Sequence, residues 1–247
     1  PASEVMAILC LAKDLEDLKF RLGNIFVGKT LDGKAIFARD LNVVGAMATL
    51  LKDAIKPNLV QTIDGNPAIL HGGPFASIAQ GTNTAIATKM GLSLGDYVVT
   101  EAGFGADLGA EKFLHIKCEQ SGLKPDAVVL VATIRAIKHH AGLAAEDFKT
   151  ENVAAIEKGF CNLEKHIENM QQFGLNPVVC INAFPDDTQA EYDKLKELCA
   201  TKGVTAIVST AFAQGGKGSA EVAQKVVEEI EKGTANYKPL YQPSDSI

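Results

Sequence analysis

The chain has 247 residues, of which 47% are hydrophobic and 22% are charged, and its formal net charge at pH 7 is -6. This composition is that of a folded protein with one large or two small domains, and it excludes a largely disordered chain. The acidic balance argues against a nucleic-acid partner, which would need a basic surface to neutralise phosphates. No apolar run approaches the ~20 residues that span a bilayer. Acidic residues stand where a signal peptide has its basic start, so we expect a soluble, cytoplasmic protein without a membrane partner.

The cysteines are odd in number, scattered, and never spaced as a CxxC pair. They are Cys10, Cys118, Cys161, Cys180 and Cys199. This pattern indicates neither a disulfide framework nor a zinc site. We interpret these residues as small buried hydrophobes and predict no metal site.

Residues 1–66 are predicted to form a small segment of helices and a β-ribbon. Apolar residues recur at three- and four-residue intervals from Val5 to Leu22, which predicts one helix that ends at Gly23. Residues 25–40 predict a two-stranded ribbon around the turn pair Asp32-Gly33. A second helix is expected over about 40–54.

Residues 67–236 alternate between apolar runs, Gly-rich breaks and amphipathic stretches. Strands are expected at 68–70, 97–100, 127–132, 178–182 and 205–208, and helices near 76–91, 106–121, 151–173, 187–201 and 218–232. Apolar strands without in-out alternation are buried on both faces, so the pattern predicts an α/β core with a mostly parallel sheet and helices on both faces. Residues 237–247 lack helical periodicity, and we interpret them as a linker toward a further domain.

Three of the predicted strands end in glycine and charge. These ends lie within residues 97–113, 131–142 and 178–188. Open parallel sheets bind ligands at the carboxyl ends of their strands. The pattern therefore predicts an enzyme that handles an anion or a nucleotide.

Residues 101–109 contain three glycines with GxGxxxG spacing, Gly103, Gly105 and Gly109. The same stretch contains Glu101 and Asp107. Small residues there let backbone N–H groups approach an anion at a helix amino terminus. The spacing departs by one residue from the dinucleotide fingerprint, so an NAD-dependent oxidoreductase is only a weak alternative. A tight turn without a ligand is the structural alternative.

A second glycine pair follows the predicted strand 68–70, in the order His71-Gly72-Gly73-Pro74-Phe75. Proline is common at the first position of a helix, so this segment predicts a flexible strand-to-helix turn. His71 could donate to a phosphoryl or carboxylate oxygen, although a histidine at a strand end is more often structural.

Positive charge gathers after the predicted strand 127–132, at Arg135, Lys138, His139 and His140. Cations at a carboxyl edge suit the clamping of a phosphoryl group. The alternative is a solvated basic loop. Two adjacent histidines do not make a metal site, because sequence neighbours rarely point at one ion.

The last two strand ends carry amides, carboxylates and glycines. Asn182 and Asp186 are placed to contact a purine edge, although Asp186 or Asp187 could instead cap the next helix. Gly215 and Gly216 belong to a candidate phosphate or base loop. This loop is not a Walker A motif, and no Walker A motif occurs anywhere in the chain.

Taken together, these blocks resemble formate–tetrahydrofolate ligase, also called 10-formyltetrahydrofolate synthetase. The likeness spans essentially the whole chain. The matching stretches are KDAIKPNLVQ (52–61), HGGPFA (71–76), VVTEAGFGADLGAEKF (98–113), VATIRAIKHHAG (131–142), NLEKHIEN (162–169) and NAFPDDT (182–188). Departures from the family pattern are modest and occur at Gln80, Ile137 and Ala141.

The resemblance implies ATP-dependent ligation of formate to tetrahydrofolate, giving 10-formyltetrahydrofolate, ADP and phosphate through formyl phosphate. ATP would enter with Mg, and a monovalent cation activator is left open. The resemblance also implies a P-loop-NTPase-like fold, with residues 1–66 at the periphery of the nucleotide domain, and a homo-oligomer. The P-loop and a C-terminal domain would lie on companion segments, so the chain is interpreted as an internal portion of the enzyme.

The resemblance also implies site roles. Arg135 and Lys138 would hold phosphate charge, His71 would be a polar contact, and Glu101 or Asp107 would orient metal-bound water or the folate amine. The expected substrate-binding residues are Phe104, Gly103, Gly105, Gly109, Gly72, Gly73 and His140, and the expected nucleotide-binding residues are Asn182, Asp186, Gly215 and Gly216. A second hypothesis is that the chain by itself is an inactive assembly unit, because a sheet without its P-loop strand has an open edge.

Overall fold

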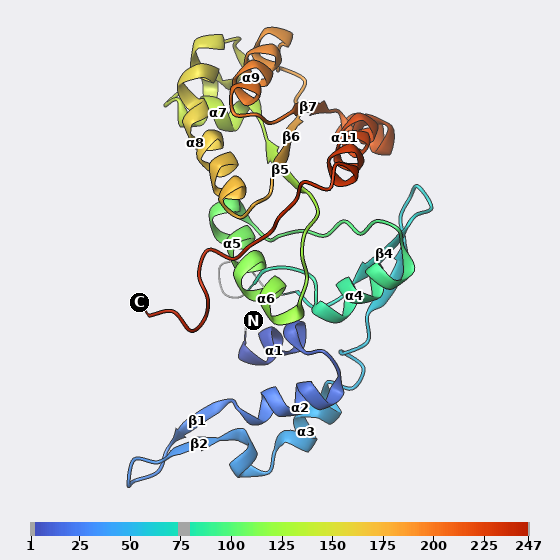
Figure 1. The fold of residues 1–247 in the computed structure, drawn as a ribbon, viewed down its shortest axis with the longest axis vertical. Coiled ribbons are helices and arrows are strands. Elements are labelled where there is room, and N and C mark those ends of the chain that lie inside the picture. Colours follow the sequence, from blue (N-terminus) through green and yellow to red (C-terminus); the bar gives the residue numbers. More distant parts are fainter. Residues whose placement is uncertain (1–2, 74–79, 247) are drawn as a thin grey trace. The chain divides into compact units, whose positions relative to one another are not determined.

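The computed structural model describes residues 3–73 and 80–246 (Figure 1). The chain divides into two compact units, Pro1–Leu123 and Lys124–Ile247. This division differs from the predicted boundary between residues 66 and 67, which would cut through an antiparallel hairpin that pairs Asn58 with Leu70. Pro74, Phe75 and the start of the predicted helix 76–91 lie outside the described residues.

Unit 1 begins with two helices where the sequence predicts one. Helix α1 (Glu4–Leu11) is capped by Ser3, and α2 (Leu15–Gly23) by Asp14, whose carboxylate accepts the Asp17 N–H at 2.8 Å. An Asp at this position competes with the helix by bonding the backbone locally, which ends one helix and starts the next. The apolar periodicity continues across the break, because both helices pack into one core.

The predicted ribbon is confirmed. Strands β1 (Phe26–Lys29) and β2 (Ala35–Phe37) pair antiparallel, and the turn between them places Gly33 at a φ of 85°. A 3-10 turn, η1 (Ala38–Leu41), leads into α3 (Val44–Leu50), which is shorter than the predicted helix 40–54. The core of this region contains Leu9, Ala12, Leu18 and Leu22, with Val44 and Met47 packed against it.

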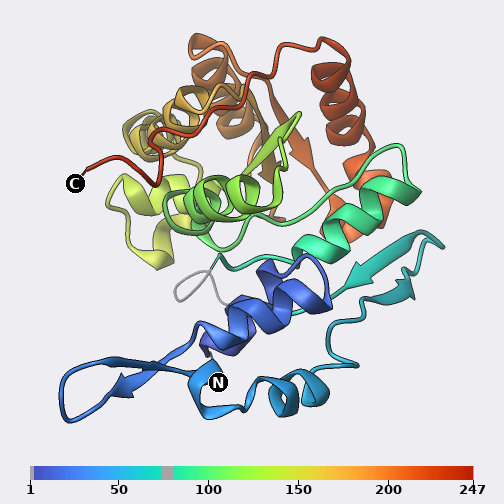
Figure 2. The same cartoon turned by 60° about the horizontal axis from the view of Figure 1, so that its bottom comes forward.

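Two of the strands predicted for the parallel sheet are not part of it. The segment predicted at 68–70 is β4 (Pro67–Leu70), which forms an antiparallel hairpin with β3 (Asn58–Gln61). Figure 2 shows this teal hairpin and the blue ribbon as two separate strand pairs. Residues 97–100 form no strand. Both segments have the composition of β-strands. Composition alone does not determine which strand a segment pairs with, or whether it pairs at all.

The helices of unit 1 that follow are α4 (Ala85–Leu94) and a helical stretch from residue 105 to 121. The stretch alternates between π- and α-helix, as η2 (Gly105–Gly109), α5 (Ala110–Lys112), η3 (Phe113–Cys118) and α6 (Glu119–Ser121). π-helical turns are rare and occur frequently at functional sites. The predicted helix 106–121 is thus confirmed in extent, with a different winding.

Unit 2 is an α/β unit with a three-stranded parallel sheet in the order β5-β6-β7. The strands are β5 (Val128–Ala132), β6 (Pro177–Asn182) and β7 (Ala206–Ser209). All three lie where the sequence predicts them. In β6 the burial expected on both faces is observed, since Val178, Val179 and Ile181 are all buried.

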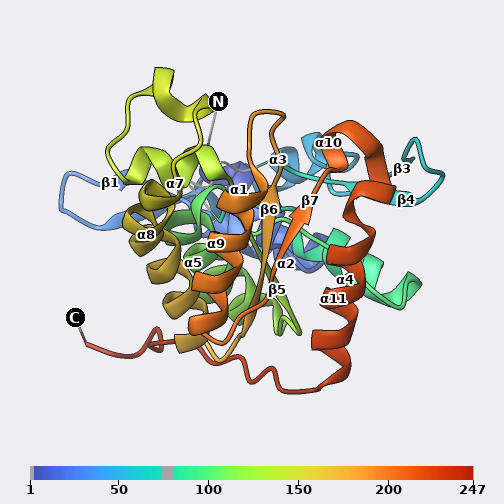
Figure 3. The same cartoon turned by 90° about the horizontal axis from the view of Figure 1, so that it is seen from above.

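Helices cover both faces of this sheet, as predicted. Figure 3 shows α8 (Val153–Gln172) and α9 (Gln189–Thr201) on one side of the strands and α11 (Ala220–Glu231) on the other. The connection after β5 also contains α7 (Ile134–His140) and the 3-10 turn η4 (Ala145–Lys149). After β7 come α10 (Ala211–Gln214) and the 3-10 turn η5 (Gly215–Ser219).

The tail runs along the end of α8. The N–H groups of Asn236 and Lys238 donate to the carbonyls of Gly174 and Phe173, each at 3.0 Å. Gly174 has a φ of 78°, and a Cβ there would meet the Asn236 carbonyl oxygen at 2.1 Å, so only glycine permits this approach. Among the described residues, no helix is long and apolar enough to cross a membrane.

Candidate functional site

The carboxyl ends of β6 and β7 enclose a cleft of about 260 Å³. It is lined by Ala183, Phe184, Pro185, Tyr192, Val208, Thr210, Phe212 and Ala213. Phe212, on α10, is 98% exposed, although an aromatic side chain of this size is usually at least half buried. The aromatic residues of the wall are Phe184, Tyr192 and Phe212. The cleft lies at the edge of the sheet where parallel sheets bind ligands.

Arg135, on α7, is placed beside Phe184 and Asp186. Its guanidinium lies 4.0 Å from the centroid of the Phe184 ring, and its Nη2 donates to Asp186 Oδ2 at 3.0 Å. Both side chains of the ion pair are about one-third exposed. Arg135 Nε is buried, and within the described part of the chain it has no hydrogen-bond partner. The sequence predicted a cation and a carboxylate at neighbouring strand ends, and the structure brings these two together.

Asp187 holds the loop that carries Phe184. Its Oδ2 accepts the Phe184 N–H at 2.8 Å and the Tyr192 hydroxyl at 3.0 Å. Burial raises the pKa of Tyr192, and the negative charge of Asp187 raises it further. The phenol therefore stays a hydrogen-bond donor at every physiological pH, and it joins the loop after β6 to α9.

Lys138 is fully buried, contrary to its predicted contact with phosphate. Its Nζ donates to Glu191 Oε1 at 2.6 Å and to the Phe148 and Thr150 carbonyls, each at 2.9 Å. An ammonium group has three N–H donors, and the protein uses all three. Burial by itself would raise the pKa of Glu191, but hydrogen bonds from Lys138 and from two backbone N–H groups outweigh it and lower the pKa. The pair joins α7 to α9 instead of facing a ligand.

The remaining predicted residues of unit 2 differ in exposure. Asn182, at the end of β6, is exposed, and so are His140 on α7 and the Gly215-Gly216 pair. The loop after β7 is drawn back onto the sheet end, because the Thr210 N–H donates to the Gly218 carbonyl at 3.0 Å. A Cβ at Gly218 would lie 2.5 Å from Thr210 C, so this close packing requires glycine.

The glycines of residues 103–109 have a clear structural role. Gly103 and Gly105 have φ values of 89° and 77°, a conformation that favours glycine. A Cβ at Gly109 would lie 2.4 Å from Gly103 C, so Gly109 lets the loop pack directly on the helical stretch. The predicted tight turn is present. Phe104, at the tip of this loop, is 82% exposed, and Glu101 and Asp107 are also exposed.

His71 is buried in unit 1 with both ring nitrogens engaged. Nε2 lies 2.7 Å from the Ala54 carbonyl and Nδ1 lies 2.7 Å from Thr84 Oγ1. A carbonyl only accepts, so Nε2 donates and the Thr84 hydroxyl donates to Nδ1. Thr84 in turn caps α4 by accepting the Ala87 N–H at 3.1 Å. This network leaves no ring nitrogen for the predicted substrate contact, whereas the adjacent Gly72 and Gly73 are exposed.

Lys117 is a buried cation that the sequence analysis did not single out. It is fully buried, and its Nζ donates to Thr82 Oγ1 at 3.0 Å and lies 5.4 Å from the Phe113 ring centroid. Among the described residues, no carboxylate lies within 4 Å of it. Burial lowers its pKa to about 8, against the raising effects of Cys118, Cys10 and Glu101. A charged residue buried without a counter-ion is costly for folding.

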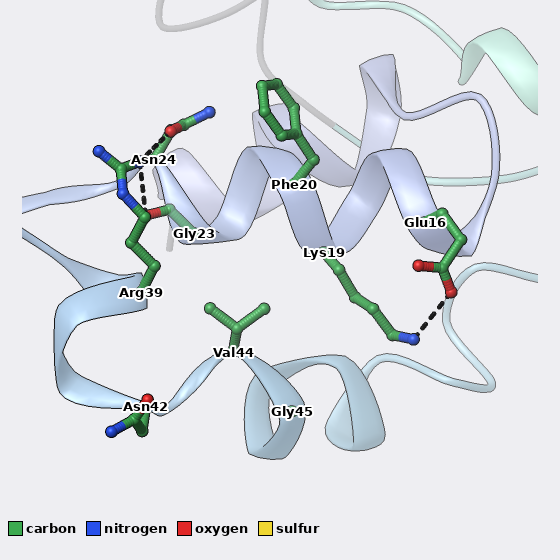
Figure 4. Close-up of a pocket in the computed structure, with 9 residues that line it drawn as sticks. All are labelled: Glu16, Lys19, Phe20, Gly23, Asn24, Arg39, Asn42, Val44 and Gly45. Atoms are coloured by element: carbon green, nitrogen blue, oxygen red, sulfur yellow. Dashed lines mark hydrogen bonds and ion pairs between the residues drawn. The ribbon is translucent and has the colours of Figure 1, made fainter.

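A second, larger cleft of about 740 Å³ lies in unit 1 between α2 and the turn that leads into α3 (Figure 4). Figure 4 shows Phe20 on the far side of α2, Arg39 bonded to Asn24, and Lys19 paired with Glu16. No residue of this cleft was predicted to carry chemistry. Glu16 and Lys19 are paired with each other and Arg39 is bonded to the amide of Asn24, and we assign this cleft no catalytic role.

The described residues contain no group of three His, Cys, Asp or Glu side chains arranged to hold a metal ion. His139 and His140 are exposed neighbours whose ring centroids lie 5.9 Å apart, and His139 also packs edge-on against Phe148.

The residues that shape the cleft were not predicted as site residues. They are Phe184, Tyr192 and Phe212, together with Asp187, which was predicted only as a possible helix cap. A signal was present for two of them, because Phe184 lies two residues after Asn182 at the end of β6, and Phe212 lies three residues after Ser209 at the end of β7. An aromatic residue after a buried strand was not counted as chemistry-bearing. Tyr192 could be found only from the fold, since it reaches the cleft from within α9.

Comparison with known proteins identifies relatives over the whole chain. The family model for formate–tetrahydrofolate ligase matches residues 1–247. The formate–tetrahydrofolate ligase of Granulibacter bethesdensis is 59% identical over 244 residues, which are 99% of this chain and 42% of that protein. The enzyme of the same name from Pelagibacter ubique is 57% identical over 241 residues, which are 98% of this chain and 43% of that protein. The chain thus spans about two fifths of the length of these relatives.

Proposed function

Because the chain belongs to the formate–tetrahydrofolate ligase family, we propose that it supplies part of the site at which ATP drives the joining of formate to tetrahydrofolate. This family membership sets aside the dinucleotide-dependent oxidoreductase. The rest of the site would come from family sequence that this chain does not span, including the segment that carries the P-loop. The chain by itself would then be a non-catalytic part.

The proposed reaction has two steps that balance. A formate oxygen attacks the γ-phosphorus of ATP, which forms formyl phosphate and releases ADP. The N10 amine of tetrahydrofolate then attacks the formyl carbon, phosphate leaves, and the nitrogen loses its proton. Both steps develop negative charge on phosphoryl oxygens, so a cation at the reacting group accelerates them. Mg would enter the site bound to the nucleotide phosphates, whose oxygen atoms are the ligands that it prefers.

The observation that carries the proposal is the aromatic cleft at the ends of β6 and β7. Its volume of about 260 Å³ is enough for one bicyclic ring and too small for a whole substrate. Both ATP and tetrahydrofolate contain a bicyclic ring system with a planar part that can stack: the whole purine in ATP, and the pyrimidine half of the reduced pterin in tetrahydrofolate. Stacking of such a ring on Phe184 or Phe212 contributes about 0.5–1.5 kcal/mol beyond the area buried. Asn182 and the second carboxylate oxygen of Asp186 would contact the polar edge of the ring.

Arg135 is the cation that we place in contact with substrate. Its guanidinium is held by Phe184 and Asp186 but is one-third exposed, so a face remains accessible to a phosphate or carboxylate. Arginine stacked on an aromatic ring binds such groups with a fixed orientation. Lys138 would support this arrangement indirectly, by holding α7 against α9 through Glu191.

Unit 1 carries its own candidate residues. Phe104, at the tip of the loop formed by Gly103, Gly105 and Gly109, would contact the formyl phosphate intermediate or the pterin. Glu101 or Asp107 would orient the folate amine. These roles rest on the family pattern and on the exposure of the three side chains.

Ligand binding tests the cleft without requiring turnover. Isothermal titration calorimetry would measure the affinity of this chain for MgATP and, separately, for tetrahydrofolate. We expect Phe212→Ala to weaken the binding of one of them by about tenfold. Phe20→Ala is the matched control, because Phe20 is also exposed (71%) but does not line the cleft at the ends of β6 and β7. The ligand whose binding is weakened shows whether the cleft holds the purine or the pterin. The assignment would be refuted if the Phe212 variant bound each of the two ligands as tightly as the parent chain does.

Turnover tests the proposed division of the enzyme. Formation of 10-formyltetrahydrofolate would be assayed with this chain alone and with the chain co-produced with the two flanking parts of the Granulibacter bethesdensis ligase. We expect activity only in the combination, and Arg135→Ala should lower turnover there at least tenfold while the unfolding midpoint changes little. Activity of the chain alone would show that the missing P-loop is dispensable.

A further inference from the structure

The buried ammonium of Lys117 has more N–H donors than the protein around it fills. Its Nζ donates to Thr82 Oγ1 at 3.0 Å, and within the described part of the chain it has no other hydrogen bond and no ion pair. The Phe113 ring, 5.4 Å away, faces the charge but carries none of its own. Lys138 in unit 2 is equally buried, yet it fills all three donors and pairs with Glu191. Two donors of Lys117 thus stay without an acceptor.

No neighbouring group of unit 1 supplies negative charge to Lys117 at neutral pH. The groups near enough to raise its pKa are Cys118, Cys10 and Glu101. Both thiols stay protonated, because burial raises the pKa of Cys10 and raises that of Cys118 to about 12. Glu101 is exposed, and it forms no ion pair with Lys117. The charge of this ammonium is therefore not compensated by the residues that the structure describes.

Two further polar side chains of this region are buried without a partner. Gln80, two residues before Thr82, is 2% exposed, and its Nε2 has no hydrogen-bond partner among the described residues. Ser121 lies four residues after Lys117 on the same helical stretch, and its buried Oγ also has none. Buried polar groups are nearly always hydrogen-bonded. Because the ammonium and the amide nitrogen can only donate, this region has unfilled donors and needs an acceptor.

We propose that Lys117 and Gln80 bind a small monovalent anion inside unit 1, of the chemical class that chloride and formate represent. An anion accepts hydrogen bonds and supplies the missing negative charge, whereas a water molecule does only the first. Thr82 orients the ammonium, because its hydroxyl donates to the Asn83 carbonyl at 3.1 Å and thereby turns a lone pair to Lys117. Ser121 would donate to the same ion.

Burial and side-chain size limit the ligand to a few atoms. Cys10, Thr82 and Cys118 around Lys117 are short side chains that are at most 1% exposed. A phosphate ester, a nucleotide or a folate does not fit among such groups, so this site is separate from the exposed residues of the proposed function. Its test requires neither ATP nor tetrahydrofolate, and its failure would leave the proposed function unaffected.

Salt dependence of stability tests the site in the chain as it stands. Urea unfolding at pH 7, with hydrogen exchange of residues 105–121, would be measured in sodium gluconate, sodium chloride and sodium formate at equal ionic strength. Gluconate carries the same charge but is too large for a buried site. An ion that binds only the folded state lowers the unfolding constant about elevenfold at ten times its Kd. We expect chloride or formate to lower this constant at least about fivefold relative to gluconate.

Variants assign the effect to the two side chains. Lys117→Met should fold and lose the difference between the salts, whereas Lys89→Met, at an exposed lysine of α4, should keep it. Gln80→Met keeps the length of the side chain without its N–H donors and should weaken anion binding about tenfold. Gln80→Glu should place a carboxylate beside the ammonium, so that added chloride or formate no longer changes the unfolding constant.

The Lys117 ammonium can also be observed directly. In a chain with ¹⁵N-labelled lysine, its Nζ signal is identified by its absence from the Lys117→Met spectrum, and it should shift on titration with chloride or formate until the site is saturated. The ion that saturates the signal at lower concentration identifies the preferred ligand. Equal stability of the parent chain in all three salts, an equal salt response of Lys117→Met, or an Nζ signal that does not move would overturn the proposal. Any of these results would show that water alone satisfies the buried donors.

Discussion

Replacing Lys117 with Met should stabilise unit 1 at neutral pH. Lys117 is fully buried, no carboxylate among the described residues lies within 4 Å of it, and burial lowers its pKa from 10.5 to about 8. A difference of one pKa unit corresponds to about 1.4 kcal/mol, so burial of the charged ammonium lowers the free energy of unfolding by about 3 kcal/mol. Loss of the hydrogen bond to Thr82 offsets about 1 kcal/mol. The net gain expected at pH 7 is therefore about 2 kcal/mol.

The stability difference between the Lys117→Met protein and its parent should depend on pH. Between pH 8 and 10.5 the folded protein has released the Lys117 proton while the unfolded chain still holds it, so the stability of the parent protein rises with pH. By pH 9.5 about 2 kcal/mol of the penalty has disappeared, and the advantage of Lys117→Met should shrink to nearly zero. Burial also raises the pKa values of the nearby Cys10 and Cys118, which lowers stability above about pH 9. Lys117 itself lowers both of these pKa values, so this contribution differs between the two proteins at high pH and is smallest in the comparison at pH 7 and 8.

Denaturant titration with hydrogen exchange of α4 and of residues 105–121 would measure the stability of unit 1 at pH 7, 8, 9 and 9.5. Lys89→Met, at an exposed lysine of α4, is the matched control and should change stability by less than about 0.5 kcal/mol. A Lys117→Met protein that is less stable than its parent at pH 7 would refute the reasoning. A constant difference between the two proteins across this pH range would also refute it.

Three further predictions concern packing and the cleft. Glu191→Gln should cost about 3 kcal/mol or more at pH 7, because it leaves the buried Lys138 ammonium without its counter-ion. Since the pKa of Glu191 is lowered, this stabilisation should be lost from the parent protein as pH falls through the folded-state pKa, and urea unfolding from pH 7 to 3 would show it. Gly109→Ala should lower the free energy of unfolding by about 2 kcal/mol, because the added Cβ clashes with the backbone of Gly103. Gly45→Ala in α3, where a Cβ meets nothing within 4 Å, should be neutral or stabilising in the same urea unfolding assay. Asp187→Ala should weaken ring binding in the cleft about tenfold by releasing the adjacent loop, and calorimetric titration of both ligands would detect it.

The local elements of unit 2 follow from the sequence, because each depends on a continuous pattern. The apolar runs that become β5, β6 and β7 are separated by amphipathic stretches long enough for α8, α9 and α11, and this order requires parallel strands with helices between them. The ribbon of residues 26–37 is equally local, since its turn is specified by two adjacent residues. Helix α1 ends early for a reason that periodicity does not show, namely that Asp14 starts a new helix with its own side chain.

Pairing and direction depend on distant residues, and there the prediction was incomplete. The segment at 68–70 has the composition of a sheet strand, but its nearest partner along the chain, residues 58–61, forms a hairpin with it instead. Arg135 and Asp186 were predicted separately, and the fold of unit 2 brings them to 3.0 Å. Lys138, three residues after Arg135, looked equivalent in the sequence, although in the fold it is fully buried against Glu191 while Arg135 stays one-third exposed.

The sequence by itself determined the family, the α/β class and the position of the strand ends that carry chemistry, because motifs and apolar periodicity are properties of short stretches. Only the tertiary structure decided which polar groups are available to a ligand. Solvent exposure and hydrogen-bond partners depend on contacts between residues far apart in the chain. For that reason His71 and Lys138 proved to be buried and fully bonded, and the aromatic side chains Phe184 and Phe212 lie open at the sheet edge.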